Sequence, residues 1–406
     1  MNPEEIKRVL LDQEEDLKRA LEKKIVPREV ADSVNASLVA PNAFLVTGVR
    51  RCGKSTLAVQ VAGRHRYARV NFDDERLSSL GAGDLNNVLE AVYTLKGDVD
   101  VLVFDEIQAV GGWEMFVSRL RDTKKVLVTG SNSSLLSREF GTRLTGRHID
   151  FTLFPFSFRE FIAYRGFAPT ETTKGVSQTK RLLEEYMSVG GFPEAQMFGR
   201  AMLRTVLDDV ILKDVVLRHG IRNERLIFEI ARFLFDNPAR EISYNRVKEA
   251  FNVPSVHTIA DYVRFLEDTF LVSTVERFSA KTLSRYTLPR KVYSVDPGLA
   301  GKDVGHVMEN LVYLELRRRG VRPTYYADPK FEVDFVTPDE LIQVTYANDQ
   351  RGIERREVRS LAEVGRKIGQ RKLKIITYDA EGEVIEGGRR IRLVPLWKYL
   401  LRAAEG

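Results

Sequence analysis

The segment Gly48–Ser55 constrains the fold of this chain more than any other stretch of its sequence, which reads Gly-Val-Arg-Arg-Cys-Gly-Lys-Ser. Its two glycines let the backbone curl until several N–H groups point at one anion. The lysine adds a positive charge, and the serine hydroxyl can bind Mg²⁺. The apolar run Phe44–Thr47 precedes the segment, and an amphipathic pattern from Thr56 to Gly63 follows it. A strand, this loop and a helix in that order predict a phosphate-binding loop at a helix N-terminus.

Short apolar runs alternate with helical patterns from Phe44 to about Phe154. Alternation of this kind is typical of an α/β fold, in which helices cover a parallel sheet. We therefore predict five strands, over residues 44–47, 68–72, 99–104, 126–129 and 149–153.

Polar side chains follow two of these predicted strands. Asp105 and Glu106 come directly after one, and Asn132 follows the next. The carboxyl ends of parallel strands line one crevice, so these groups are expected near the loop. Asp105 is suited to hold hydrated magnesium, Glu106 to orient and deprotonate an attacking water, and Asn132 to reach the γ-phosphate or that water. The alternative interpretation is that the two carboxylates cap a turn and that Asn132 ends an ordinary strand.

Composition narrows the class of protein. The chain has 406 residues, 43% of them hydrophobic, which suggests two or three domains. No apolar run approaches the roughly 18 residues that a membrane helix needs. The single cysteine, Cys52, excludes an intramolecular disulfide framework and favours a cytoplasmic location. A net charge of +6 permits a nucleic-acid partner without requiring one.

The combined motifs resemble those of an AAA+ ATPase, and in detail those of a branch found in archaea and bacteria. The resemblance covers nearly the whole chain and is carried by residues 48–56, 71–77, 104–108, 129–132, 144–147, 154–161 and 190–194. It implies a P-loop NTPase parallel sheet with a helical lid, then a winged helix and an α/β domain resembling the restriction-endonuclease-like PD-(D/E)XK nucleases. The expected division is 1–165, 166–238, 239–297 and 298–406, in that order.

The same resemblance assigns roles at the nucleotide site. ATP and Mg²⁺ would be bound, with Lys54 on the phosphates, Ser55 and Asp105 on the metal, Glu106 on the water and Asn132 as a polar sensor. Arg143 and Arg147 are candidates for an arginine finger, often supplied across a subunit interface, or else belong to a solvated or ion-paired loop. The loop residues expected to contact the nucleotide are Gly48, Val49, Arg50, Arg51, Cys52, Gly53, Lys54, Ser55 and Thr56.

Residues 241–295 contain the parts of a winged helix-turn-helix: two helical patterns joined by a short turn, then two β-rich runs. The second helical pattern has an apolar stripe, and its other face is polar. A helix of this size fits the major groove, although winged helices also dock proteins. The residues expected to contact DNA are His257, Thr258, Arg264, Arg277, Lys281, Arg285, Arg290 and Lys291.

The last block has the carboxylate spacing of a PD-(D/E)XK core, with Glu309, Asp334 and the segment Gln343–Thr345. The Glu-x-Lys element of that core is replaced, because Gln343 carries no charge and Thr345 supplies no cation. We therefore expect a nuclease-like fold without nuclease activity.

The sequence thus favours an ATPase that cleaves the β–γ phosphoanhydride and couples this step to domain rearrangement on DNA. The alternative is a nucleotide-gated switch or scaffold with slow hydrolysis that binds a protein partner. A DNA nuclease is the least favoured reading. ATP or ADP and DNA are the expected partners, a membrane is not, and a finger acting in trans would require a homo-oligomer.

Overall fold

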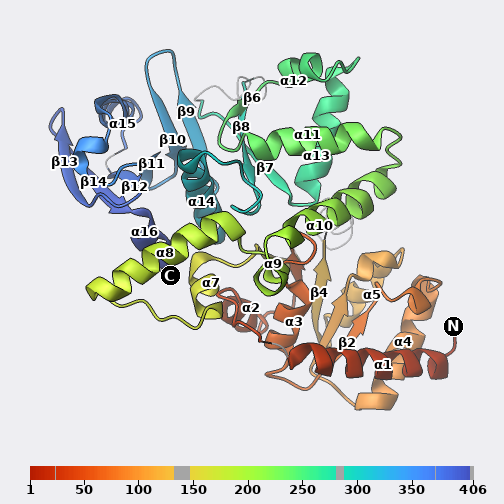
Figure 1. The fold of residues 1–406 in the computed structure, drawn as a ribbon. Helices are drawn as coiled ribbons and strands as arrows, with labels where there is room; N and C mark the ends of the chain where they lie inside the picture. Colours follow the sequence, from red (N-terminus) through yellow and green to blue (C-terminus); the bar gives the residue numbers. More distant parts are fainter. Residues whose placement is uncertain (23, 132–146, 280–287, 371, 403–406) are drawn as a thin grey trace. The chain divides into compact units, whose positions relative to one another are not determined.

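The chain folds into two compact units in a computed structural model that describes residues 1–22, 24–131, 147–279, 288–370 and 372–402 (Figure 1). The first unit contains residues 1–155, 163–166 and 268–270. The second contains residues 156–162, 167–267 and 271–406.

The first unit is built on a five-stranded sheet in which all the neighbouring strands are parallel. The strand order is β2-β3-β4-β1-β5, so the parallel α/β sheet predicted from the sequence is confirmed. The strands are β1 (Ala43–Thr47), β2 (Tyr67–Asn71), β3 (Val101–Asp105), β4 (Lys125–Gly130) and β5 (His148–Thr152).

Helices cover both faces of this sheet, which is why β1 and β3 are buried along their whole length. Alternate residues such as Leu45 and Phe104 join one apolar cluster with α1, α4 and α5, while α3 contacts β1, β3 and β4. The helices of the unit are α1 (Pro3–Leu21), α2 (Ala31–Ser37), α3 (Lys54–Ala62), α4 (Leu85–Lys96) and α5 (Trp113–Leu120), with 3₁₀ turns η1 (Glu75–Leu77), η2 (Ala82–Asp84) and η3 (Ile107–Ala109).

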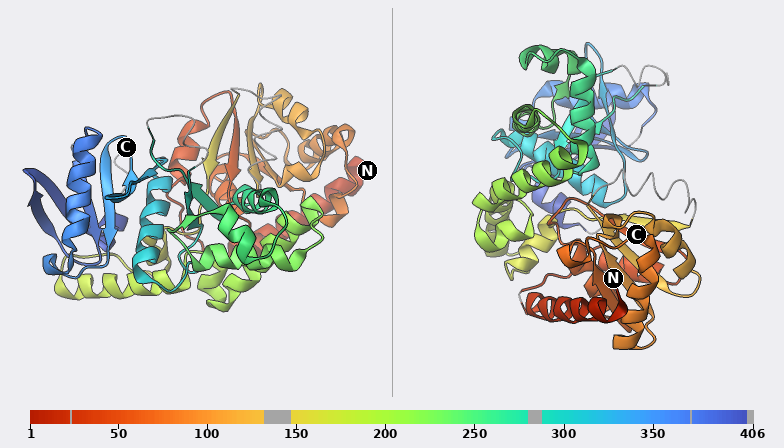
Figure 2. Two further views of the ribbon diagram at one scale, coloured as in Figure 1. Left: turned by 90° about the horizontal axis from the view of Figure 1, so that it is seen from above. Right: turned by 90° about the vertical axis from the view of Figure 1, so that its right-hand side faces the viewer.

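Helix α1 lies against α4 and β2 (Figure 2). Strand β2 is one of the two outer strands of the sheet. The Gln13 amide donates to the carbonyl oxygen of Asn71 and accepts from the Asn71 N–H, both at 2.9 Å. One side chain of α1 therefore satisfies both backbone groups of a residue on this edge.

The second unit begins with a run of helices. Helix α10 continues into the π-helical stretch η4 without a break in the chain, where seven residues from Ile211 to Leu217 are wound more loosely than an α-helix. The elements are α7 (Phe158–Tyr164), α8 (Thr173–Val189), α9 (Pro193–Phe198), α10 (Ala201–Val210), η4 (Ile211–Leu217) and α11 (Glu224–Asp236).

A three-stranded antiparallel sheet with two helices follows, in the strand order β6-β8-β7. Helix α13 buries Ile259, Val263 and Leu266, the middle of the predicted apolar stripe. The elements are β6 (Glu241–Ile242), α12 (Tyr244–Ala250), α13 (Val256–Asp268), β7 (Val272–Val275) and β8 (Arg290–Ser294).

A six-stranded mixed sheet, in the order β13-β14-β12-β11-β10-β9, forms the rest of the unit. Leu341 packs in the cluster that includes α15, whereas the next residue, Ile342, is buried on the other face, where α14 contacts β11. The elements are α14 (Val304–Arg318), β9 (Thr324–Ala327), β10 (Glu332–Val336), β11 (Glu340–Thr345), η6 (Gln350–Gly352), α15 (Arg355–Lys367), β12 (Lys372–Thr377), β13 (Gly382–Glu386), β14 (Arg389–Pro395) and α16 (Leu396–Leu401).

Among the described residues, no helix combines the length and the apolar character that crossing a membrane would require.

Candidate nucleotide and magnesium site

The loop between β1 and α3 depends on two glycines. Gly48 has φ +146° and Gly53 has φ +100°, both in the region that favours glycine. A Cβ on Gly48 would lie 2.1 Å from the carbonyl oxygen of Leu153, so no other residue fits there without a shift of backbone. Close contact with Leu153, the residue that follows β5, therefore fixes the curled path of the loop.

Arg28 stabilises this loop through hydrogen bonds. Its guanidinium donates to the carbonyl oxygens of Cys52 at 2.8 Å and Phe154 at 2.6 Å, and the residue is only 6% exposed. Cys52 is fully buried, with Sγ 3.4 Å from the oxygen of Leu153, and this burial raises the pKa of its thiol. A buried neutral thiol is a packing group and not a reactive nucleophile.

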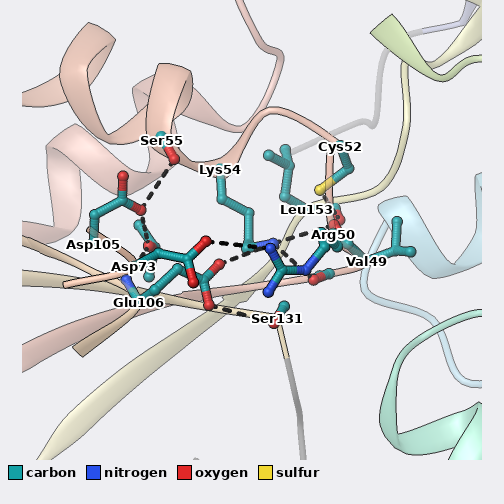
Figure 3. Close-up of polar contacts among 12 residues, drawn as sticks. Val49, Arg50, Cys52, Lys54, Ser55, Asp73, Asp105, Glu106, Ser131 and Leu153 are labelled. Atoms are coloured by element: carbon teal, nitrogen blue, oxygen red, sulfur yellow. Dashed lines mark hydrogen bonds and ion pairs between the residues drawn. The ribbon is translucent and has the colours of Figure 1, made fainter. Parts of the chain in front are cut away.

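Lys54 begins α3 and turns its ammonium back under the loop. Nζ donates to the carbonyl oxygens of Gly48 at 3.1 Å and Val49 at 3.2 Å, and it lies 3.8 Å from Oε1 of Glu106 (Figure 3). The residue is 5% exposed. A buried ammonium that is held by neutral carbonyls and one carboxylate can attract an anion such as phosphate.

Asp105, at the end of β3, is held from several sides and is 2% exposed. The Ser55 hydroxyl donates to its Oδ1 at 3.0 Å, and the Thr129 hydroxyl donates to the same oxygen. The guanidinium of Arg69, from β2, pairs with Oδ2. Neighbours on both flanking strands thus fix this carboxylate. Figure 3 shows it beside Ser55.

Glu106 follows in the left-handed region, with φ +53°, which is uncommon for a residue other than glycine. Its carboxylate accepts from the Ser131 hydroxyl at 3.3 Å and from the Gln108 amide. Its own N–H donates to Thr129. A non-glycine residue that is kept in this conformation by its surroundings is a common feature of functional sites.

The residues present fit a magnesium ion. The Ser55 hydroxyl and the Asp105 carboxylate are hard oxygen donors that lie within hydrogen-bond distance of each other, beside a lysine. Mg²⁺ in proteins is commonly held by one or two such groups together with substrate phosphates and water, rather than by a complete protein cage. Among the described residues no group of three His, Cys, Asp or Glu side chains could hold a metal alone.

The structure brings Lys54, Ser55, Asp105 and Glu106 together, as expected from the sequence. Asn132 and Arg143 lie outside the described residues. Arg147 is exposed just before β5, and its carbonyl accepts from the Ala43 N–H at 3.1 Å. The missed contributors include Arg28, Arg69, Thr129 and Ser131. Thr129 and Ser131 had a signal, because they precede Asn132 at a strand end.

The residues predicted to contact DNA are scattered. On α13, His257 and Arg264 are exposed and Thr258 is half-buried. Arg264 pairs with Asp261 at 2.8 Å and lies over the Phe265 ring. Arg277 and Arg290 are half-buried, and Arg290 pairs with Glu276 at 3.3 Å. Lys281 and Arg285 lie outside the described residues.

Lys291 contradicts its prediction as a phosphate contact. It is 3% exposed, and its ammonium lies 3.0–3.1 Å from the carboxylates of Glu309, Glu332 and Asp334. The prediction was wrong because alternation along a short strand does not reveal that three acidic partners, all later in the chain, enclose this side chain.

The Lys291 cluster contains both carboxylates that the nuclease-like spacing singled out. The Tyr293 hydroxyl donates to Glu309 at 2.7 Å, and Oδ2 of Asp334 accepts from the Val344 N–H at 2.9 Å. Burial and the nearby Asp334 charge raise the pKa of Glu309 to about 8. Gln343 is buried and accepts from the Asp334 N–H at 3.4 Å. The cation that lies among these carboxylates is thus the ammonium of Lys291.

Residues 40–162 match the AAA domain family, and residues 180–305 match a domain of unknown function (DUF8612). Together with the parallel sheet and the loop, the first match defines an AAA-type P-loop ATPase fold, a class that binds nucleotides. The chain belongs to the same family as the uncharacterized protein MJ1544 of Methanocaldococcus jannaschii, which is 33% identical over 97% of this chain and 94% of its own length.

Two further similarities are weaker. An uncharacterized protein of Haemophilus influenzae is 28% identical over 75% of this chain and 82% of its own length. Among solved structures, the Walker-type ATPase PABY2304 of Pyrococcus abyssi is 18% identical, with a TM-score of 0.45 over 68% of this chain and 95% of that one.

Proposed function

We propose that the first unit binds ATP with Mg²⁺ and hydrolyses its β–γ phosphoanhydride. The proposal rests on one observation: Lys54, Ser55, Asp105 and Glu106 gather at the carboxyl edge of the parallel sheet, where ligands of open α/β folds bind. The glycine loop beside them directs N–H groups at an anion.

Each side chain has its own task in this proposal. Lys54 binds the terminal phosphates, and Ser55 and Asp105 hold the metal, which when bound neutralises charge that develops on the phosphate oxygens. Glu106 orients the attacking water and takes its proton, because its carboxylate lies 3.8 Å from the ammonium of Lys54. Asn132 acts as a polar sensor, and Arg143 or Arg147 supplies the cationic finger. A finger acting in trans would make the working form a homo-oligomer.

Two substitutions test these roles. Glu106→Gln should retain ATP affinity and lower the turnover number by about 100-fold or more, since it removes the group that activates water. Lys54→Ala should weaken nucleotide binding itself. Calorimetric titration with a non-hydrolysable ATP analogue and steady-state phosphate release separate the two effects.

Matched controls are available in the same unit. Glu90→Gln changes an exposed carboxylate on α4, and Lys125→Ala changes a half-buried lysine at the amino end of β4, away from the loop. Neither should alter binding or turnover. Normal hydrolysis by Glu106→Gln would rule out its role, and an absence of nucleotide binding by the wild type would end the proposal.

We further propose that residues 239–297 form a winged helix that contacts DNA and that ATP turnover moves this segment. Support comes from the helix–helix–hairpin order and from the exposed His257 and Arg264 on α13. The double substitution His257→Ala/Arg264→Ala should lower duplex affinity and reduce its salt dependence. Arg225→Ala, which changes an exposed, ion-paired arginine on α11, is the control. Equal gel shifts for the two variants would contradict DNA contact.

The second candidate is a nucleotide-gated switch that binds a protein partner. The observation favouring it is that α13 presents Arg264 already paired with Asp261, a mixed-charge surface rather than a uniformly basic one. An ATPase rate measured with and without DNA separates the two, because only a DNA-coupled ATPase should be stimulated. Nuclease activity is disfavoured, since Gln343 and Thr345 replace the charged element and Lys291 fills the carboxylate cluster.

A further inference from the structure

Arg69 is a charged side chain at the nucleotide site that no motif predicts. It lies on β2, in register with Val103 of β3, while Asp105 is in register with Asn71. The guanidinium therefore reaches two residues along the neighbouring strand to meet the Asp105 carboxylate. Its side chain is 14% exposed, which is low for an arginine on the outer strand of a sheet.

The contact is directed at one oxygen. Nη2 of Arg69 bonds Oδ2 of Asp105, whereas Oδ1 accepts from the hydroxyls of Ser55 and Thr129. The two carboxylate oxygens thus have separate partners: Oδ2 pairs with a cation from β2, and Oδ1 accepts from one hydroxyl on α3 and one on β4. With Oδ2 held, the carboxylate cannot rotate to exchange the two oxygens without breaking an ion pair.

Among the described residues, Asp105 is the hydrogen-bond partner recorded for the Arg69 side chain, and its buried Nε has none. A half-buried guanidinium that leaves one N–H unsatisfied costs the fold stability, and only its ion pair offsets that cost. The contact is to the carboxylate assigned to magnesium.

We propose that Arg69 is a positioning residue for the magnesium site: it fixes Oδ2 of Asp105 so that Oδ1 stays beside Ser55, the other residue that would hold the metal. The inference rests on the proposed nucleotide function. Groups that hydrogen-bond a metal-binding carboxylate orient it, and their loss typically weakens metal affinity about 10- to 100-fold. The contact of Arg69 is to Asp105 and not to the glycine loop, so its effect should appear only when Mg²⁺ is present.

The test is calorimetric titration of a non-hydrolysable ATP analogue in EDTA and at increasing Mg²⁺. For Arg69→Met, affinity in EDTA should match the wild type, while the Mg²⁺ concentration needed for half of the affinity gain should rise about 10-fold or more. Arg69→Lys should restore most of the loss, because the native contact uses a single nitrogen. The readout does not depend on hydrolysis.

Arg66→Met is the matched control, since Arg66 precedes β2 and pairs with Asp100 at an exposed position. It should leave both titrations unchanged. Coincident Mg²⁺ curves for Arg69→Met and the wild type would overturn the positioning role, as would an equal loss of affinity in EDTA. A wild type that binds no nucleotide would instead reject the proposed function. If Arg69→Met does not fold, Arg69→Gln, which keeps an N–H donor without charge, takes its place under the same criteria.

Discussion

At the scale of single residues, Lys291 shows that the surroundings of a lysine determine whether it can contact a ligand or is held in ion pairs inside the protein. Its ammonium is enclosed by Glu309, Glu332 and Asp334, two of which are buried like itself. A buried ion pair adds little net stability compared with apolar packing, because desolvation offsets the attraction. Removing one partner is costly all the same, since it leaves the others charged and unpaired.

Lys291→Met should therefore destabilise the second unit by about 3–5 kcal/mol, the range for breaking a buried ion pair. Urea unfolding followed by circular dichroism measures the loss. Lys302→Met, at an exposed position before α14, is the control and should change the free energy of unfolding by less than about 0.5 kcal/mol. Equal stabilities of the two variants would show that the cluster contributes nothing through its lysine.

The residues of the candidate site that could be predicted from the sequence are those that belong to a local motif. Lys54 and Ser55 follow from one loop, and Asp105 and Glu106 from one strand end. Arg28, Arg69 and the burial of Lys291 could not be predicted, because each depends on partners more than 15 residues away along the chain. A single arginine or lysine has no local pattern that separates a surface position from a buried ion pair.

At the scale of elements, the turn from α8 to α9 is built around a buried aspartate. Gly190 has φ +82°, and a Cβ there would lie 1.8 Å from Oδ1 of Asp296. The Asp296 carboxylate accepts from the N–H groups of Gly191 at 2.6 Å and Gly298 at 2.9 Å. Because Gly190 and Gly191 have no side chains, the backbone can approach the Asp296 carboxylate closely enough to hydrogen-bond with it.

Gly190→Ala should destabilise the protein by more than Gly199→Ala. Gly199 has a similar backbone conformation, with φ +88° and ψ 169°, but a Cβ there meets nothing within 4 Å. Both variants incur the backbone strain of about 1–3 kcal/mol, and only Gly190→Ala adds overpacking of about 1–3 kcal/mol. Thermal unfolding of the two proteins gives the difference. Equal melting temperatures would mean that Asp296 moves aside freely.

Elements with a strong local pattern were predicted well. The five strands of the first unit lie within two residues of their predicted bounds, because apolar runs between turn residues define them. Helix α1 buries Ile6, Val9, Leu10 and Gln13, and none of the residues that follow them in the helix. The π-helical stretch η4, which continues α10 and contacts α11, was not predicted from the sequence.

At the scale of the molecule, stability should depend on pH through two buried carboxyl groups and one half-buried one in the second unit. Desolvation by burial is the main cause in each case, and it raises the pKa of Glu309 to about 8, of Glu357 to about 7 and of Asp296 to about 6. Their ordinary values are 4.5 for Glu and 3.8 for Asp. Between its ordinary pKa and its raised pKa, each of these groups keeps its proton in the folded protein but has lost it in the unfolded chain.

The free energy of unfolding should therefore be highest on the acid side of this window and fall as the pH rises from about 4.5 to about 8. Each group contributes a slope of up to about 1.4 kcal/mol per pH unit while only the folded form holds its proton. Glu309→Gln should flatten the dependence, and Glu249→Gln, at an exposed position on α12, should not. Melting temperatures that rise towards about pH 8 would contradict the raised pKa values.

The Gln13 side chain has a consequence beyond its two hydrogen bonds with Asn71. It acts as a one-residue substitute for a sixth strand, occupying backbone groups that an outer strand otherwise offers to any extended polypeptide. Detaching α1 would expose these backbone groups of Asn71. The Gln13 amide should therefore hinder a strand of another molecule from pairing with this edge of the sheet.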